Sequence, residues 1–280
     1  MDIGERLAEA RERLSPAERR VAEVVLARPE AIAFGTVASL ASEASTSGPT
    51  VVRTATKLGY DGFVALQAAV QEELAGRLRP AAAAIRTRPA PDPLRRSLEI
   101  ETSNVHDTLA AVDPAAFDEV TRSLADRGRR VAVLSGEATL GPAHVMADAL
   151  GMLRPGVQLF VGTEVRVVRQ LALLDPRDVL VAIDLRRYER WVLEAAERAA
   201  AGGLTLVAIT DGLLSPLAAH AAHVFVVNAT GAGPFDSHVG TMALCNALVA
   251  GTAARLRRTA TARLDRVERL WAQTGALVDR

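Results

Sequence analysis

Apolar residues in the first quarter of the chain recur at the spacing of amphipathic helices. One helix is predicted to begin after Ser15, because Ser15 and Glu18 have the spacing of a capping box and Pro16 stands at the first helical position. Valines follow at i, i+3 and i+4, and the helix should end near Arg28, before a proline.

Two shorter helical patterns come next. Thr36 is a good N-cap for the first, and the second starts at Ser47 and runs to Leu58. Gly59 supplies a stop, and helix resumes over residues 67–78. The chain therefore begins with an all-helical domain, predicted to span residues 1–77.

The pattern breaks between residues 77 and 93, where alanine, arginine and proline dominate. Such a composition is typical of a linker between domains. A helix is predicted over residues 94–111, so the linker and connecting helix together cover residues 78–112.

After residue 129 short apolar runs alternate with segments of helical length. The runs occupy residues 131–134, 157–161, 179–183, 204–209 and 224–227. This alternation predicts an α/β fold, a doubly wound parallel sheet of five strands over residues 113–258. A long helix over residues 238–258 and a helical tail over residues 259–280 complete the expected domain organisation.

Composition narrows the class of protein. With 280 residues, 49% of them hydrophobic, the chain can form two cores. No apolar run reaches the length of a membrane span and the first residues lack a signal pattern, so a soluble cytoplasmic protein is expected. The lone Cys245 excludes an internal disulfide, and neither a metal site nor a cofactor is predicted. The balance of 33 cations and 33 anions gives no general indication of nucleic-acid binding.

The stretch STSGPTVVRTATKLGYDGF, residues 45–63, carries the first candidate site. If the second and third helices form a helix-turn-helix, the third would enter the major groove by its N-terminal end. Ser45, Ser47 and Thr50 could then hold phosphates, Arg53 a phosphate or a guanine edge, and Lys57 a phosphate. The same pattern also fits an ordinary helical hairpin, in which Ser47 is only a cap and Arg53 only a solvated residue.

These residues also carry a family resemblance. Residues 1–77, approximately, resemble the N-terminal domain of RpiR-type bacterial transcription regulators. The resemblance is carried by the segment LSPAERRVA, the later VASLA, and Ser-x-x-Thr-Val-x-Arg followed by KLGY-x-GF. The resemblance implies binding to double-stranded DNA, at a palindromic operator, by a homodimer or homotetramer. Thr54 departs from the family, which usually has an aromatic residue there, and this should affect helix packing more than DNA contact.

RpiR-type regulators join that domain to a sugar isomerase (SIS) domain, and the second half of this chain is similar to one. The correspondence is clearest in AITD, residues 208–211, and SPLA, residues 215–218. The resemblance implies two hydroxyl-rich loops that hold a sugar phosphate. The first loop here keeps Ser135 and Thr139 but has Glu137 where the family prefers glycine.

The second loop departs further from the family pattern Ser-x-Ser-Gly-x-Thr, since it reads DLRRYE over residues 184–189. On one interpretation the site is rebuilt, with Arg186 or Arg187 binding an anionic group and Asp184 accepting from hydroxyls. On the other the site is lost and the arginines form salt bridges or are solvated.

The leading prediction is a transcription regulator whose SIS-like domain senses a small anionic metabolite, a sugar phosphate or sugar acid. It is not expected to be an enzyme, because Glu137, His144 and His238 stand in no motif that carries a general base. The alternative is a sugar-phosphate isomerase, or another SIS-domain enzyme, with an accessory helical domain. A third possibility is that the SIS-like domain only dimerises.

Overall fold

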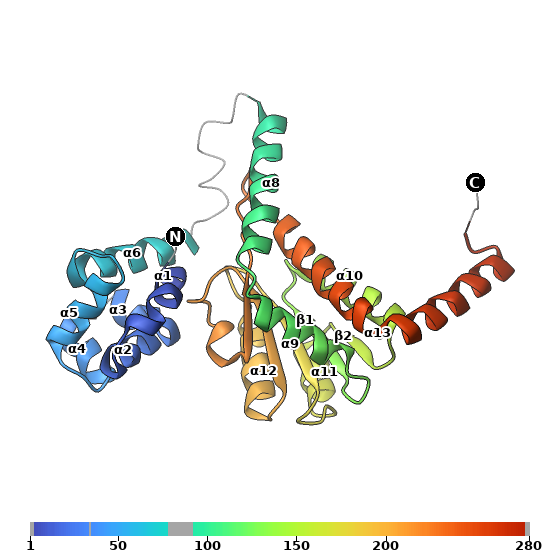
Figure 1. The fold of residues 1–280 in the computed structure, drawn as a ribbon, viewed down its shortest axis with the longest axis horizontal. Helices are drawn as coiled ribbons and strands as arrows, with labels where there is room; N and C mark the ends of the chain where they lie inside the picture. Colours follow the sequence, from blue (N-terminus) through green and yellow to red (C-terminus); the bar gives the residue numbers. More distant parts are fainter. Residues whose placement is uncertain (1–2, 34, 78–91, 278–280) are drawn as a thin grey trace. The chain divides into compact units, whose positions relative to one another are not determined.

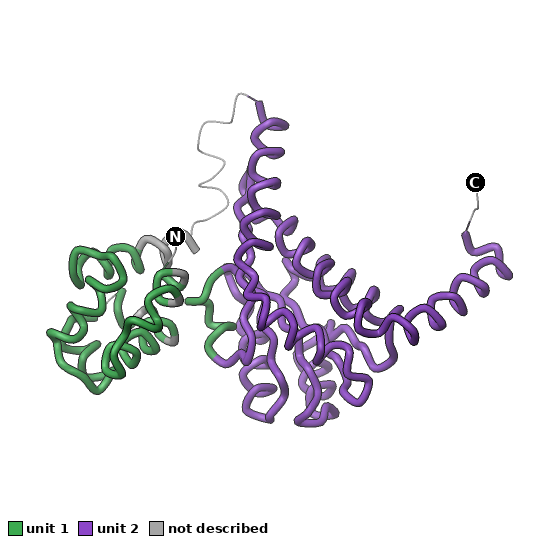
Figure 2. The backbone as a smooth tube through the Cα atoms, in the orientation of Figure 1, with its two compact units in different colours: residues 1–88, 212–219 green, residues 89–211, 220–280 purple. Residues whose placement is uncertain are grey.

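The computed structural model describes residues 3–277 except 34 and 78–91. Most of the predicted linker therefore lies outside the described residues. The chain divides into two compact units, Met1–Arg88 with Gly212–Ala219 and Pro89–Asp211 with His220–Arg280 (Figure 2). We call them unit 1 and unit 2.

Unit 1 is helical. Its elements are α1 (Ile3–Ala10), a 3-10 turn η1 (Arg11–Arg13), α2 (Pro16–Ala27), α3 (Pro29–Ala33), α4 (Val37–Glu43), α5 (Gly48–Lys57) and α6 (Gly62–Arg77). The core is built from their apolar faces, among them Leu7, Val21, Leu40, Val51 and Leu66, each under 5% exposed. Burial of these faces is the main stabilisation of helices this short.

Three helix starts follow the predicted capping residues. Ser15 accepts from the N–H of Glu18, whose carboxylate accepts from the N–H of Ser15 in return. Thr36 caps α4, with Ser39 closing the reciprocal pair, and Ser47 is the N-cap residue of α5. The helix predicted over residues 67–78 begins earlier than expected. It corresponds to α6, which starts at Gly62, whose φ of +82° turns the chain into the helix.

Unit 2 contains the predicted five-stranded parallel sheet (Figure 1). Its strands are β1 (Val131–Ser135), β2 (Val157–Phe160), β3 (Val179–Ile183), β4 (Thr205–Thr210) and β5 (His223–Val226), in the order β2-β1-β3-β4-β5. The α/β prediction is thus confirmed. The strand order reverses between β1 and β3, and in such sheets ligands bind outside the carboxyl ends of the strands at that point.

Helices cover both faces of the sheet. The helices of unit 2 are α8 (Pro93–Ala110), α9 (Pro114–Ala125), α10 (Leu140–Leu153), α11 (Glu164–Leu171), α12 (Arg190–Ala201) and α13 (Val239–Thr274). A short 3-10 turn, η2 (Ala218–His220), lies at the boundary between the two units in the sequence. One core contains apolar residues of β1, β3, β4, α9, α10 and α13, while α12 packs against β3 and β4 from the other side. Both β1 and β3 are buried along their whole length, which explains their unbroken apolar runs.

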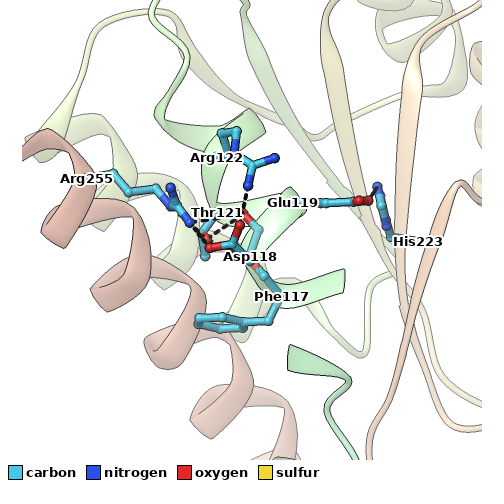
Figure 3. Close-up of polar contacts among 7 residues, drawn as sticks. All are labelled: Phe117, Asp118, Glu119, Thr121, Arg122, His223 and Arg255. Carbon is cyan, nitrogen blue, oxygen red and sulfur yellow. Dashed lines mark hydrogen bonds and ion pairs between the residues drawn. The ribbon is translucent and has the colours of Figure 1, made fainter. Parts of the chain in front are cut away.

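A polar network joins α9 to α13 (Figure 3). The guanidinium of Arg255 pairs with Asp118, which also pairs with Arg122, and Arg255 Nε donates to Thr121 Oγ1 at 3.1 Å. Gly251 permits the close approach, because a Cβ there would lie 2.7 Å from Thr121 Cγ2. The predicted helical tail is confirmed to Thr274, but the predicted boundary at residue 258 was wrong, because one helix, α13, runs from Val239 to Thr274.

Among the described residues, α13 alone is long and apolar enough, by length and composition, to cross a membrane. Its buried residues, including Leu244, Leu248 and Leu256, pack within unit 2 against α8, α9 and α10. A core helix of a folded domain passes the same test.

Candidate functional site

The second and third predicted helices form a helix-turn-helix. Helices α4 and α5 pack together and are joined by the turn at residues 44–47, in which the N–H of Thr46 donates to the carbonyl of Ala41. Ser45 takes a φ of +48°, and Arg20 holds the turn by donating to the carbonyls of Ala44 and Ser45, both at 3.1 Å. The N-terminus of α5 is thus fixed in place, as a reading helix requires.

One face of α5 is exposed. Pro49, Val52, Arg53, Thr56 and Lys57 recur at helical spacing and are all exposed, with Ser47 ahead of them at the N-cap. The apolar Val52 is 40% exposed. Val52 and Thr56 were not among the predicted site residues, although helical spacing from Arg53 places them on the same face.

Thr50, a predicted DNA contact, lies on the opposite face and is only 6% exposed. Its hydroxyl lies 2.9 Å from Ser47 Oγ and accepts from Arg53 Nη2 at 3.4 Å. The structure therefore brings Ser47, Thr50 and Arg53 together, with Thr50 as the inner member that orients the other two. Thr54, the departure from the family pattern, is fully buried and donates to the carbonyl of Thr50 at 2.8 Å.

Lys57, the only lysine of the chain, is held by its own unit. Its ammonium donates to Glu18 Oε2 at 2.7 Å and to the carbonyl of Arg13 at 3.1 Å. Glu18 is buried, and its hydrogen bond with Lys57 is the largest cause lowering the pKa of Glu18 to about 2. Lys57 thus anchors α5 to α2, while its side chain stays 42% exposed.

In unit 2 the first predicted effector loop follows β1. Thr139 is buried and donates to the carbonyl of Ile183 at 2.7 Å, which ties the loop to β3. Ser135 is 4% exposed, and its hydroxyl has no hydrogen-bond partner among the described residues. Glu137 is exposed, so its own carboxylate turns outward, while its N–H donates to the carboxylate of Glu189 from the second loop.

The second predicted loop, residues 184–189, follows β3. Asp184 is 3% exposed and accepts from the N–H of Glu189 at 2.9 Å. Arg186 forms an ion pair with Asp236, and Arg187 takes a φ of +67° and is exposed. Tyr188 donates to Asp211 Oδ1 at 2.5 Å.

Carboxylates therefore gather at the carboxyl ends of β1, β3 and β4. Burial, together with the charges of Glu189 and Asp211, raises the pKa of Asp184 from 3.8 to about 7. Asp236 and Glu189 were not among the predicted site residues, because their partners stand 50 and 52 residues away in the sequence.

Comparison with known families agrees with both units. Residues 1–77 match the helix-turn-helix domain of the rpiR family, and residues 127–251 match the SIS domain. The two matched domains together define a transcription regulator of the RpiR type, with a helix-turn-helix domain joined to a SIS domain.

Individual relatives share this architecture. An uncharacterised helix-turn-helix-type transcriptional regulator of Haemophilus influenzae is 26% identical over 221 residues, covering 76% of this chain and 75% of the relative. The sugar isomerase domain of an RpiR transcription factor from Sphaerobacter thermophilus is 29% identical, with a TM-score of 0.57, and covers 62% of this chain and 97% of that one. The Vibrio vulnificus NanR protein, solved with ManNAc-6P, shares the fold at 19% identity and a TM-score of 0.57, covering 98% of this chain and 99% of its own.

Proposed function

We propose that this regulator binds a palindromic operator in double-stranded DNA through α5 and alters that binding when a small anionic metabolite occupies unit 2. The metabolite is a sugar phosphate or sugar acid. Symmetric operators require paired reading heads, so the working form is a homodimer or homotetramer in the cytoplasm. The observation that carries the proposal is the exposed face of α5 with Arg53 on it.

The contacts of unit 1 suggest a division of labour along α5. Ser47 and the N–H groups of the first turn contact phosphate, together with the exposed Ser45. Arg53 reaches a guanine edge, and Val52 offers an apolar contact to a thymine methyl group. Thr50 orients Arg53, and Lys57 adds a phosphate contact without leaving Glu18.

The effector loops in unit 2 support an anion at the N-terminus of α10. The N–H of Glu137 already donates to a carboxylate, so it is oriented to donate to an anion. The unpartnered hydroxyl of Ser135 begins the same loop, and Thr139 holds that loop in place. A NanR protein of the same fold is known in complex with a sugar phosphate, ManNAc-6P.

The isomerase alternative is favoured by one observation, the pKa of Asp184 near 7, which suits a general base. Asp184 is nevertheless 3% exposed and is occupied by the N–H of Glu189. A base in that position does not reach a substrate proton, so we assign Asp184 a structural role and the protein no catalytic one.

The test is a pull-down of fragmented genomic DNA by the purified protein, at two salt concentrations, with and without a panel of sugar phosphates and sugar acids. We expect enrichment of one palindromic site and a change in its occupancy with one panel member. Absence of any enriched sequence at low salt, together with isomerase turnover of a panel member, would establish the enzyme instead.

Replacing Arg53 with alanine is expected to weaken operator binding by about 1–3 kcal/mol, with relaxed preference at one base pair, because a bidentate contact to guanine is lost. Arg11→Ala, which removes an exposed charge from η1, is the matched control. Affinities for the operator and for single-base variants would be measured by fluorescence anisotropy. A uniform loss over all sequences would show that Arg53 touches only phosphate, and unchanged affinity would refute the assignment.

A further inference from the structure

The side chain of Glu189 contacts another loop and not its own helix. Glu189 is the N-cap residue of α12, yet its side chain makes no capping hydrogen bond to that helix. An anionic side chain in this place is stabilised by the N–H groups of the first turn of its own helix. Here the carboxylate instead reaches across to the first effector loop, at the start of a different helix, α10.

Each oxygen of this carboxylate has a donor. Oε1 accepts from the N–H of Glu137, and Oε2 accepts from the indole N–H of Trp191 at 2.5 Å. Gly136 leaves room for the contact, because a Cβ at this position would lie 2.8 Å from Glu189 Oε1 and 2.9 Å from Asp184 Oδ1. The loop is therefore shaped around an internal anion.

A second carboxylate lies next to that of Glu189. Glu189 lies beside the buried Asp184, which accepts from its N–H at 2.9 Å. When Asp184 is ionised, the two like charges repel, and water screens that repulsion poorly in a buried site. The carboxylate thus remains at the loop because the N–H donors attract it, and a stronger anion can replace it there.

We propose that Glu189 is a built-in competitor for the anionic group of the effector. Its carboxylate occupies the N–H of Glu137 while the effector is absent and leaves when a phosphate binds, returning to the first turn of α12. This inference rests on the proposed function, since it concerns the same loop. The apparent affinity for the effector is lowered by the fraction of molecules in which Glu189 holds the loop.

Trp191 makes the exchange observable, because departure of Glu189 removes the acceptor of its indole N–H. The chain has two tryptophans, and Trp271→Phe leaves Trp191 as the only one. In that background, Glu189→Gln removes the charge and keeps the length of the side chain. Glu197→Gln, on an exposed position of α12, makes the same change of charge away from the loop.

The experiment titrates these proteins with inorganic phosphate and with a hexose 6-phosphate, at constant ionic strength, and follows Trp191 emission and calorimetric heat. Glu189→Gln should bind inorganic phosphate at least tenfold more tightly than its parent, with Glu197→Gln unchanged. Trp191→Phe, measured by calorimetry in the otherwise unaltered chain, should also bind inorganic phosphate more tightly, because Glu189 then has one donor fewer. This variant replaces Glu189→Gln in the test if Glu189→Gln does not fold.

Equal phosphate affinity in the Glu189→Gln protein and its parent, or no phosphate binding by Glu189→Gln, would overturn the inference. In either case Glu189 would be a fixed structural link between the loops. The proposed function fails by a different measurement, namely operator occupancy that responds to no sugar phosphate or sugar acid in the wild-type protein.

Discussion

Replacing Arg154 with leucine is expected to lower the free energy of unfolding of unit 2 by about 3–5 kcal/mol. Arg154 is 1% exposed at the end of α10, and no carboxylate neutralises it by a direct ion pair among the described residues. Its guanidinium donates instead to carbonyl oxygens of Leu124, Asp126, Arg129 and Pro155. Leucine would leave these buried acceptors without a donor.

Burial lowers the pKa of Arg154, but the group stays charged, so its carbonyl partners provide the compensation for lost hydration. Arg154→Lys should recover only part of the stability, because one ammonium cannot span the positions that the planar guanidinium reaches.

The measurement is urea unfolding followed by tryptophan fluorescence, since Trp191 and Trp271 both belong to unit 2. Arg127→Leu, an exposed neighbour, is the control and should change stability by no more than about 0.5 kcal/mol. If the Arg154→Leu protein unfolded at the wild-type midpoint, water would have to satisfy the carbonyls, and the buried network would not be stabilising.

Most of the sheet could be predicted from the sequence. The observed strands begin and end within one residue of the predicted runs, as for β3 (Val179–Ile183). The reason is physical: strands covered by helices on both faces need side chains that are apolar throughout, and charged or turn-forming residues flank each run. Three helix starts in unit 1 were predicted as well, from the hydroxyl residues Ser15, Thr36 and Ser47 that precede the helices.

Other boundaries carried no local signal. The five-residue helix α3 is shorter than two helical turns, so no period can be recognised in it. The tail over residues 259–280 was predicted to be helical and is helical to Thr274. The predicted boundary at residue 258 has no physical basis, because nothing in the sequence there stops a helix before Gly275.

The sequence predicted which segments carry the candidate sites but not which side chains contact one another there. The sequence placed Arg53 on the second helix of the helix-turn-helix, and helical spacing alone could have shown that Thr50 shares the buried face with Val51 and Thr54. The pairing of Lys57 with Glu18 joins residues 39 positions apart, and no spacing rule connects them. The same holds for Glu189, because its partner Glu137 belongs to a loop on another strand.

Replacing Asp184 with asparagine is expected to remove a pH dependence of stability. The folded state raises the pKa of Asp184 to about 7, chiefly by burial, whereas the unfolded chain has the ordinary value of 3.8. Between those pH values the folded protein binds a proton that the unfolded protein has released, so the free energy of unfolding falls as pH rises. The loss is on the order of 4 kcal/mol and is complete above pH about 8.

Asparagine stays neutral, and its carbonyl oxygen can still accept from the N–H of Glu189. The variant should therefore match the wild type near pH 4 and exceed its stability by several kcal/mol at pH 8. Urea unfolding followed by tryptophan fluorescence at intervals from pH 4 to 8 measures the difference, with Asp265→Asn on the exposed side of α13 as control. Parallel curves for Asp184→Asn and wild type would contradict the raised pKa. Curves that meet near pH 4 and separate toward pH 8 would show that the ionised Asp184 lowers stability at neutral pH. That is the condition under which an external anion competes with Glu189.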